Sequence, residues 1–426
     1  MKGTKKLVRD YLKEEFPGKL DCTPSANEII DRVKSKYGTT RNPETIVSLE
    51  LDKDEKSFKY LFIALGAAVR GWNYLRKVVA IDATFLTGQY KGTLVVATAQ
   101  DGDHHQYPLA WGIIDREKDA SWRSIIKAVR EVYKEAGHGF CARHIAQNLK
   151  VKVNRGMERK SSRGETVAER FFRCTEAYTL QEFEDIFNDL KNMYPKVDEY
   201  MQKEELDPEK WARCKFKRER YNLLTTNGAE SINSVLKKAK RFLVLGTLLD
   251  IYLSKTVEWF DRHRVEAESA DDSQNLTPHV DKVLHARYEM TCTYEVTMLN
   301  SNTEEFEVRD ENGRKHLVSI AHRTCSCRVF DIDKIPCSHA MAAVHKVGKS
   351  SIIPNLCSPC YLRETWRLAY QETVYPVPDC CEWSIDDPNI ANLMVLPPIQ
   401  NRFPGPGEAR KKIYCATRAS TSTIFG

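Results

Sequence analysis

Four soft metal-binding side chains lie within fifteen residues of one another, and they constrain the fold of their region more than any other feature of the sequence. Cys325 and Cys327 form a Cys-x-Cys pair, and Cys337 and His339 form a Cys-x-His pair after a nine-residue spacer. Zinc binds four tetrahedral nitrogen and sulfur ligands, and two close pairs joined by a short loop supply them with little loss of chain entropy. Because four protein ligands leave no position for a catalytic water, the spacing predicts a structural zinc site.

The residues around this cluster predict how each pair is held. A Cys-x-Cys pair suits a strand end or a turn, with the intervening Ser326 pointing away from the metal. Cys337 stands before an expected helix from Ser338 to Val344, and a helix N-terminus favours a thiolate. The alternative is a chance cluster in a chain with 13 cysteines. Three strand-like segments precede the cluster and complete a zinc module over residues 290–350: Tyr294–Leu299, Glu305–Arg309 and Lys315–Ile320.

A second cysteine pair follows the first cluster. Cys357 and Cys360 form a Cys-x-x-Cys pair that could hold another metal ion. A further pair of ligands would be needed, and Cys380 and Cys381 are the cysteines that could fold back to provide it. We consider incidental free thiols the better interpretation.

The amino-terminal half contains short apolar runs separated by turn residues, a pattern typical of consecutive strands. One of these runs ends at Asp82, which places a carboxylate at the end of an apolar strand. Carboxylates held in this way bind Mg²⁺ in enzymes of phosphoryl transfer, although strands also often end in a solvated aspartate. Residues 122–150 and 165–270 are predicted to be mainly helical. The expected strands are Phe58–Gly66, Lys77–Asp82, Gly92–Ala99 and Tyr107–Asp115.

The overall composition is that of an ordinary globular chain. The 426 residues are 42% apolar and 29% charged, and a net charge of +6 permits a nucleic-acid partner without requiring one. The longest apolar run, Leu61–Val69, would cover about half of a bilayer, so we expect no membrane contact. Met1–Arg9 does not resemble a secretory signal, and the many cysteines then favour free thiols and metal ligation in an intracellular protein.

Several sequence words, taken in order, resemble the Mutator-like element (MULE) transposase family of plants. The segment from Cys325 to Ala340 resembles a SWIM-type zinc finger, whose pattern is Cys-x-Cys, a spacer and Cys-x-His. Cys357–Tyr370 and Tyr375–Pro378 resemble the tail that follows this finger in those transposases, and the whole resemblance covers roughly residues 5–400. The words that resemble the transposase domain are Ile81–Leu86, Tyr90–Leu94, Tyr107–Asp115, Ala120–Trp122, Cys141–His144 and Thr225–Asn233.

This resemblance implies a fold and a set of site residues. The fold class is α/β, with an RNase H-like core that is interrupted by a helical insertion and followed by a small zinc-binding module. The family uses two aspartates and a glutamate to bind Mg²⁺ or Mn²⁺, and Asp82 and Glu230 match the first aspartate and the glutamate. Cys141 and His144 match the Cys-x-x-His of the family, for which a buried structural Cys and His is the alternative interpretation.

The second aspartate of the triad has no counterpart in this sequence. In the family it ends a strand between the Ser-Trp helix and the Cys-x-x-His. Residues 122–140 are too few for a helix, a strand and a second helix, which need at least about 25 residues. We therefore expect internal deletions that remove this strand and leave a vestigial catalytic pair. We do not expect a replacement from Asp101, Asp115 or Asp119.

Three segments are rich in lysine and arginine, and two of them flank Glu230. A transposase must hold polyanionic DNA near its metal ions, and such segments give salt-dependent binding without sequence preference. The alternative for each segment is a solvated helix face. The third segment is 150–163. The candidate DNA-binding residues of the two flanking segments are Arg213, Lys215, Lys217, Arg218, Lys237, Lys238, Lys240 and Arg241.

These observations predict a transposase-derived protein of the nucleus that binds structural Zn²⁺ and non-specific DNA. Its ancestral activity is DNA strand cleavage and transfer with Mg²⁺ or Mn²⁺, and we expect this activity to be impaired. The alternative is a non-enzymatic regulator of transposase descent that binds DNA or protein; a homo-oligomer is also considered. We expect a helical remnant at 1–48, the core at 49–164, a helical insertion with the glutamate helix at 165–270, the zinc module at 290–350 and an irregular tail at 351–426.

Overall fold

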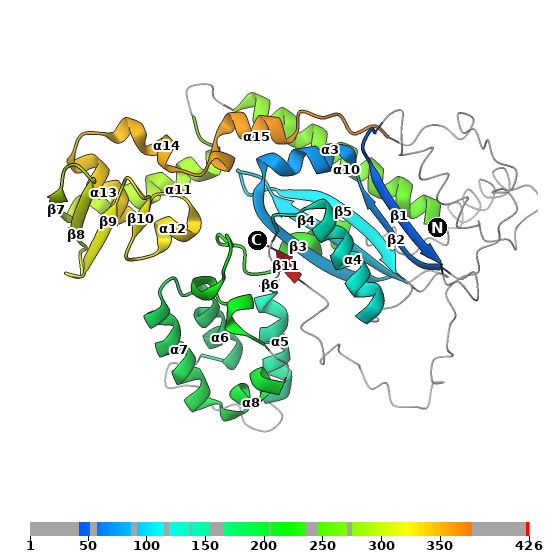
Figure 1. Cartoon of the computed structure of the whole chain (residues 1–426), viewed down its shortest axis with the longest axis horizontal. Helices are drawn as coiled ribbons and strands as arrows, with labels where there is room; N and C mark the ends of the chain where they lie inside the picture. Colours follow the sequence, from blue (N-terminus) through cyan, green and yellow to red (C-terminus); the bar gives the residue numbers. More distant parts are fainter. Residues whose placement is uncertain are drawn as a thin grey trace, which may run out of the picture.

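Figure 1 shows three parts: a large β-sheet with its helices, a separate cluster of helices, and a small sheet with helices at the far end. The structure, a computed structural model, describes residues 42–51, 58–86, 92–114, 119–136, 139–153, 165–203, 206–235, 245–270, 275–376 and 423–425. The remnant expected at 1–48 falls almost wholly outside these ranges. The same is true of most of the basic segment 150–163 and of Lys237, Lys238, Lys240 and Arg241.

The short apolar runs form strands of the large sheet, as the sequence predicts. The strand order is β1-β2-β5-β4-β3-β11-β6, and all neighbouring strands are antiparallel. β1 is a strand that the sequence pattern did not indicate, and it begins before the expected domain boundary at 48, since Ile46 pairs with Ala64. The strands are β1 (Ile46–Leu51), β2 (Phe58–Ala64), β3 (Arg76–Phe85), β4 (Thr93–Gln100), β5 (Gln106–Ile114), β6 (Gly139–Phe140) and β11 (Thr423–Phe425).

Two helices cover this sheet, with α4 (Asp119–Val132) in front of it and α10 (Leu245–Ser269) behind it in Figure 1. The central strands β3, β4 and β5 are buried along most of their length, which agrees with their almost uninterrupted apolar sequences. Ile125 of α4 and Phe260 of α10 share one core with these strands. This close-packed core fixes the position of Asp82, which lies towards the end of β3.

The strands β3 and β6 run parallel to each other, but they are separated by β11. The backbone of β11 pairs with both neighbours: Thr423 lies opposite Ile81 of β3 and opposite Phe140 of β6. A space one strand wide therefore separates the Asp82 strand from the segment that leads into α5, and a piece from the C-terminal end of the chain fills it. This strand falls in a region for which the sequence predicts only irregular structure.

Four helices after β6 form a second core beside the sheet. In α6 a capping box fixes the first turn: Glu169 N donates to the Thr166 hydroxyl, and Thr166 N donates to the Glu169 carboxylate. α8 begins at Pro195, whose fixed φ suits the first helical position. Trp211 is fully buried in this core, and its indole N–H donates to Leu206 O at 3.0 Å. The helices are α5 (Ala142–Val153), α6 (Val167–Glu176), α7 (Leu180–Met193) and α8 (Pro195–Lys203).

The prediction of an irregular tail from residue 351 is wrong for residues 351–370, which form short helices, the first against the zinc module and the last against the large sheet. Trp366 and Tyr370 belong to the main core. Both donate to the buried carboxylate of Asp101, from Nε1 at 2.7 Å and from the hydroxyl at 3.0 Å. The prolines of this region suggest a loop, but aromatic burial against a distant strand orders it. The elements here are η6 (Ser350–Ile352), α14 (Ile353–Leu356), η7 (Pro359–Tyr361) and α15 (Arg363–Ala369).

The zinc module is built on a four-stranded sheet of order β10-β9-β8-β7. Its strands agree closely with the predicted segments, because turns such as Asp310–Gly313 separate short alternating runs. Phe306, Val308 and Val318 from the sheet pack against Ala343 of the last helix. The elements are α11 (Pro278–Glu289), η5 (Met290–Thr293), β7 (Glu295–Asn300), β8 (Glu305–Arg309), β9 (Lys315–Ser319), β10 (Thr324–Cys325), α12 (Val329–Asp333) and α13 (Ser338–Lys346).

Candidate functional site

The four predicted zinc ligands come together at one end of the small sheet. Cys325 ends β10, Cys327 follows it, and Cys337 and His339 lie at the start of α13. Their ligand atoms all lie within 4.8 Å of one another, and His339 Nδ1 is 3.7 Å from Cys325 Sγ and 3.9 Å from Cys337 Sγ. Zinc with bonds of about 2.3 Å to sulfur and about 2.0 Å to nitrogen separates two tetrahedral ligands by about 3.5 Å. The cluster therefore fits a tetrahedral zinc ion.

The backbone holds each pair as the spacing predicts. Ser326 is exposed, and it pairs with β9 on the side away from the cluster: Leu317 N donates to its hydroxyl at 3.1 Å. Cys337 is the N-cap residue of α13, and its sulfur accepts a hydrogen bond from Ala340 N at 3.4 Å. A helix N-terminus stabilises negative charge, so this position favours the thiolate form that binds zinc.

The three thiols are so close that they shift one another's pKa values. Hydrogen bonds with Cys325 and Cys337 lower the pKa of Cys327, whereas hydrogen bonds with Cys327 and Cys337 raise the pKa of Cys325. Burial raises the pKa of Cys337 to about 12. Three neighbouring sulfurs, two of them buried, therefore compete for protons at one point. A soft cation resolves this competition, because it binds all the thiolates at once and releases their protons.

A second cluster joins Asp82, His144 and Glu230, whose ligand atoms lie within 4.8 Å of one another. The three residues come from β3, α5 and α9 (Asn227–Val235). Both carboxylates already have partners: Asn233 Nδ2 donates to Asp82 Oδ2 at 2.8 Å, and Arg143 Nη1 donates to Glu230 Oε2 at 2.5 Å. A divalent cation at this cluster would have to compete with the arginine for Glu230.

Cys141 and His144 have different roles in the structure. The Cys141 sulfur is buried and accepts hydrogen bonds from Thr226 N and Thr226 Oγ1, both at 3.4 Å, so it fixes the start of α9. Burial alone would raise the pKa of Cys141 and lower that of His144, but the hydrogen bond between them reverses both shifts. Cys141 thus acts as the buried structural residue that the alternative interpretation foresaw, whereas His144 reaches the two carboxylates.

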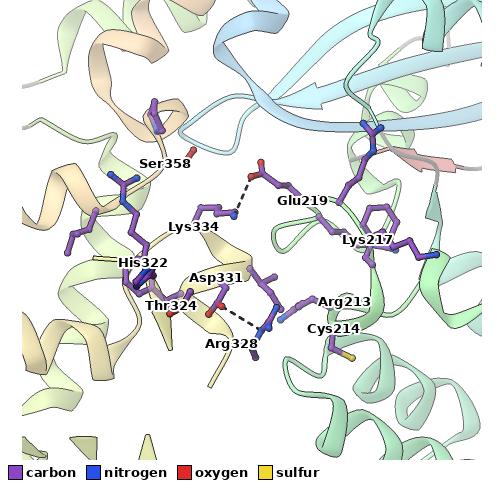
Figure 2. A pocket seen from close by; sticks show the side chains of 18 residues that line it. Arg213, Cys214, Lys217, Glu219, His322, Thr324, Arg328, Asp331, Lys334 and Ser358 are labelled. Carbon is purple, nitrogen blue, oxygen red and sulfur yellow. Dashed lines mark ion pairs between the residues drawn. The ribbon is translucent and has the colours of Figure 1, made fainter. Parts of the chain in front are cut away.

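A cleft of about 640 Å³ lies between the segment 213–220 and the zinc module. Figure 2 shows basic side chains on both of its walls. Three of the candidate DNA-binding residues line it: Arg213, Lys217 and Arg218. Lys215 is not among the lining residues, and its ammonium group instead lies 3.6 Å from Glu184 and over the ring of Phe183.

Three family models match the chain. Residues 78–137 match the MULE transposase domain, residues 119–245 match the Mutator-family transposase, and residues 294–348 match the SWIM zinc finger. The chain therefore contains regions similar to Mutator-family transposases and to a SWIM zinc finger. The predicted resemblance to the MULE transposase domain and to the SWIM finger is thus confirmed, and all four candidate zinc ligands lie inside the SWIM match. Neither the curated proteins nor the solved structures contain a match to the chain.

Asp101 belongs neither to the zinc-ligand cluster nor to the cluster of Asp82, His144 and Glu230. Asp101 follows β4, where Gln100 pairs with Arg76 at the start of β3. Asp82 lies six residues further along β3, which corresponds to about 20 Å at 3.3 Å per residue. The carboxylate of Asp101 is also occupied by the aromatic donors of the C-terminal helices. Asp101 therefore does not replace the second aspartate, in agreement with the expectation from the sequence. Asp115 and the side chain of Asp119 lie outside the described residues.

The second cysteine pair remains a pair of thiols among the described residues. Cys357 Sγ donates to Ile353 O at 3.7 Å, and Cys360 Sγ donates to Ser358 Oγ at 3.4 Å. Burial raises the pKa of Cys357 to about 12, and no third metal ligand joins the pair in the part of the chain that the structure describes. Cys380 and Cys381 lie outside it. Across the same residues, no helix has the length and apolar character needed to cross a bilayer.

Sequence reasoning missed five residues that shape these sites. Asn233 stands three positions after Glu230, so helical periodicity alone places both on one face of α9, and this spacing could have revealed it. Arg143 lies inside the Cys-x-x-His word, but its pairing with Glu230 depends on the fold. The other three line the cleft from the zinc module and gave no signal as a group: Arg323, Arg328 and Lys334.

Proposed function

We propose that this chain is a zinc-stabilised DNA-binding protein of transposase descent that does not cleave DNA. Its transposase domains imply an interaction with DNA. The order of its elements supports an RNase H-like core, since the antiparallel strands β3, β4 and β5 are followed by α4 and then by a strand parallel to β3. Such a protein acts on chromosomal DNA, and a fluorescent fusion of the full chain should accumulate in the nucleus.

One observation supports the proposed loss of DNA cleavage. In the family, the strand with the second aspartate lies between the Ser-Trp helix and the Cys-x-x-His. The strand at that place is β6, and its residues, Gly139 and Phe140, are not acidic; nor is any residue of β4 or β11, the two strands that pair with β3. Among the described residues, the third member of the cluster with Asp82 and Glu230 is His144 rather than a carboxylate.

The remaining carboxylates are poorly suited to two-metal catalysis. Two divalent ions about 4 Å apart need several acidic ligands to hold the attacking and leaving oxygens in line. Here Asp82 and Glu230 are the acidic ligands of the cluster, and Arg143 already neutralises Glu230. The chain therefore retains the scaffold that would position DNA near the cluster, but it lacks the charge needed to stabilise a phosphoryl transition state.

A nicking assay on supercoiled DNA with Mg²⁺ or Mn²⁺ tests this function. The full chain should show no more nicking than its Asp82→Asn variant, while both bind DNA with equal affinity. Metal-dependent nicking that disappears in the Asp82→Asn variant would overturn the proposal.

A second candidate function is residual metal-dependent cleavage, and one observation favours it. His144 brings an imidazole to the two carboxylates, and a site with two carboxylates and one imidazole suits Mn²⁺ better than Mg²⁺. Bound there, a divalent cation would supply Lewis acidity and an activated water, with Asp82, His144 and Glu230 as its ligands. Nicking that requires Mn²⁺ and is lost in both Asp82→Asn and His144→Ala would favour this candidate.

A further inference from the structure

The cleft between segment 213–220 and the zinc module has a strong excess of positive charge. Seven of its lining residues are arginine or lysine, and two are acidic. The acidic residues are Glu219 and Asp331, which pair with Lys334 at 3.4 Å and with Arg328 at 3.8 Å. The basic lining residues are Arg213, Lys217, Arg218, Arg220, Arg323, Arg328 and Lys334. Such a cleft attracts a polyanion.

Most of these side chains are at least partly exposed, and two of them have partners outside the cleft lining: Lys217 pairs with Glu209 at 2.5 Å, and Arg218 Nη1 donates to Glu135 O at 2.5 Å. Arg220 is an exception: it is fully buried and donates to Lys210 O and Phe140 O, both at 2.9 Å, so it holds the wall together. Arg323 is exposed and makes no ion pair within the described parts of the chain. The pair between Lys334 and Glu219 joins the two walls, as Figure 2 shows, but both side chains are more than a third exposed. A solvent-screened pair of this kind is weak, and a phosphate can replace the carboxylate.

The backbone of the zinc module gives an independent indication. Arg323, Arg328 and Lys334, the three finger cations, have φ values of 52°, 66° and 59°. This left-handed conformation costs free energy in any residue other than glycine. Three positions where glycine would fit best therefore carry long basic side chains, and all three line the same cleft. Strained positions that cluster in this way are typical of binding sites.

The three finger cations lie within three residues of the candidate zinc ligands in the sequence. Arg323 stands two residues before Cys325, Arg328 directly follows Cys327, and Lys334 stands three residues before Cys337. The turns that carry them close by backbone hydrogen bonds, such as Arg328 N to Cys325 O at 2.8 Å. A zinc ion that fixes the four ligands therefore also fixes the three cations along one wall.

We propose that this cleft binds the phosphodiester backbone of DNA between segment 213–220 and the zinc module, so that zinc loading controls DNA affinity. The proposal rests on the DNA-binding function proposed above and names its site. The opposite wall is continuous in sequence, through Tyr221–Thr226, with α9, which carries Glu230. Contacts of charged side chains with phosphates carry no sequence information, and the site therefore binds without sequence preference.

The test is a titration of random-sequence duplex DNA with the full chain at several salt concentrations, followed by fluorescence anisotropy. The key variant combines Arg323→Gly, Arg328→Gly and Lys334→Gly, because glycine removes the charge and relieves the left-handed backbone. It should keep its zinc, bind at least tenfold more weakly at low salt, and show a slope of log K against log[salt] that is flatter by about 2 to 3. The matched control, Arg309→Gln with Arg314→Gln, removes charge from the same module outside the cleft and should change affinity less than twofold.

The possible outcomes distinguish a failure of the proposed cleft from a failure of the proposed DNA-binding function. If the wild-type chain binds duplex DNA but the glycine variant binds equally well, the cleft is not the site and the DNA-binding function stands. A wild-type chain that does not bind duplex DNA at all would overturn both proposals. Polyglutamate that displaces the duplex as well as unlabelled DNA does would show a cleft for acidic polypeptides and would overturn the DNA assignment. Zinc removal by chelation should weaken binding at least as much as the glycine variant; unchanged affinity would overturn the control by zinc.

Discussion

Cys337 has two roles that can be separated at the scale of a single residue. Its sulfur is one of the candidate zinc ligands, and it also caps α13 by accepting a hydrogen bond from Ala340 N. Serine is a good N-cap residue but a poor zinc ligand, so a serine at this position keeps the cap and removes the metal bond. The effect of such a change therefore reports on zinc rather than on helix capping.

We predict that Cys337→Ser in the full chain abolishes stoichiometric zinc binding and unfolds the module. The reason is that binding of structural zinc contributes directly to the folding free energy of small modules. Metal analysis of the purified chain measures the stoichiometry, and Co²⁺ substitution reports thiolate ligation through its absorption bands. Cys292→Ser is the control, because Cys292 is an exposed free thiol outside the cluster. Unchanged zinc content in Cys337→Ser would contradict the assignment.

A second prediction at this scale concerns Arg143. Removing its charge should raise the affinity of the acidic cluster for Mn²⁺, because Glu230 then loses its competing partner. The Arg143 side chain is 42% exposed, so solvent screening limits the gain to about 1 kcal/mol, or about fivefold. Electron paramagnetic resonance of Mn²⁺ with Arg143→Gln measures the change. The double variant Arg143→Gln with Asp82→Asn should lose the gain, and a gain that survives would place the ion elsewhere.

At the scale of elements, Asp101 joins the end of β4 to the C-terminal helices. Its carboxylate is fully buried and accepts from Asp103 N, His105 N, Trp366 Nε1 and the Tyr370 hydroxyl. We predict that Asp101→Ala lowers the free energy of unfolding by about 3 kcal/mol or more, because it leaves several buried donors without an acceptor. Urea unfolding measures the loss. Glu311→Ala, an exposed change, should stay within about 0.5 kcal/mol of the wild type, and an equal loss in both would contradict this role.

The contact of Asp101 with the His105 side chain makes the free energy of unfolding depend on pH. The hydrogen bond with Asp101 raises the pKa of His105 above its usual value of 6.5, against the effect of burial. The stability from this contact is therefore fully present below pH 6.5 and is lost as the pH rises through the raised pKa. Urea midpoints across this window should fall less steeply in Asp101→Asn than in the wild type. A parallel fall in both proteins would show that His105 does not titrate against Asp101.

Elements defined by local patterns were predictable from the sequence, and those defined by distant contacts were not. Glu305–Arg309 was predicted to the residue because short alternating runs end at turns. The four zinc ligands were readable because both pairs are close in sequence. By contrast, the docking of Trp366 depends on Asp101, 265 residues away, and no local pattern encodes that contact. The basic cleft escaped prediction for the same reason, since its walls are about a hundred residues apart in sequence.

At the scale of the whole molecule, each site is assembled from segments that are far apart in the chain. The large sheet is completed between β3 and β6 by residues 423–425, and the acidic cluster joins three elements on either side of the helical insertion. A chain of transposase descent can keep only a two-residue strand at this place, β6, without the aspartate, and still keep the surfaces proposed to bind nucleic acid, because those surfaces lie on other elements. Loss of chemistry and retention of binding are therefore compatible in one fold.

The last prediction concerns how these surfaces add up in DNA binding. If the whole chain neutralises about five phosphates, log K should fall with log[salt] with a slope of about −4 to −5. The basic segment that follows Glu230 should contribute separately from the cleft, so we predict that reversing four of its charges flattens the slope further when it is combined with the glycine variant of the cleft. The four changes are Lys237→Glu, Lys238→Glu, Lys240→Glu and Arg241→Glu.

Whether the changes in slope add up decides if the basic segment after Glu230 binds DNA separately from the cleft. Two sites that contact different phosphates of one duplex contribute independent numbers of released counterions, so their slope changes should sum. Anisotropy titrations of the wild type, each set of changes and their combination provide the four slopes. If the four reversals change nothing in either background, the segment is a solvated helix face and the cleft alone binds the backbone. If they remove all binding while the cleft variant has no effect, DNA lies along the segment after Glu230 instead.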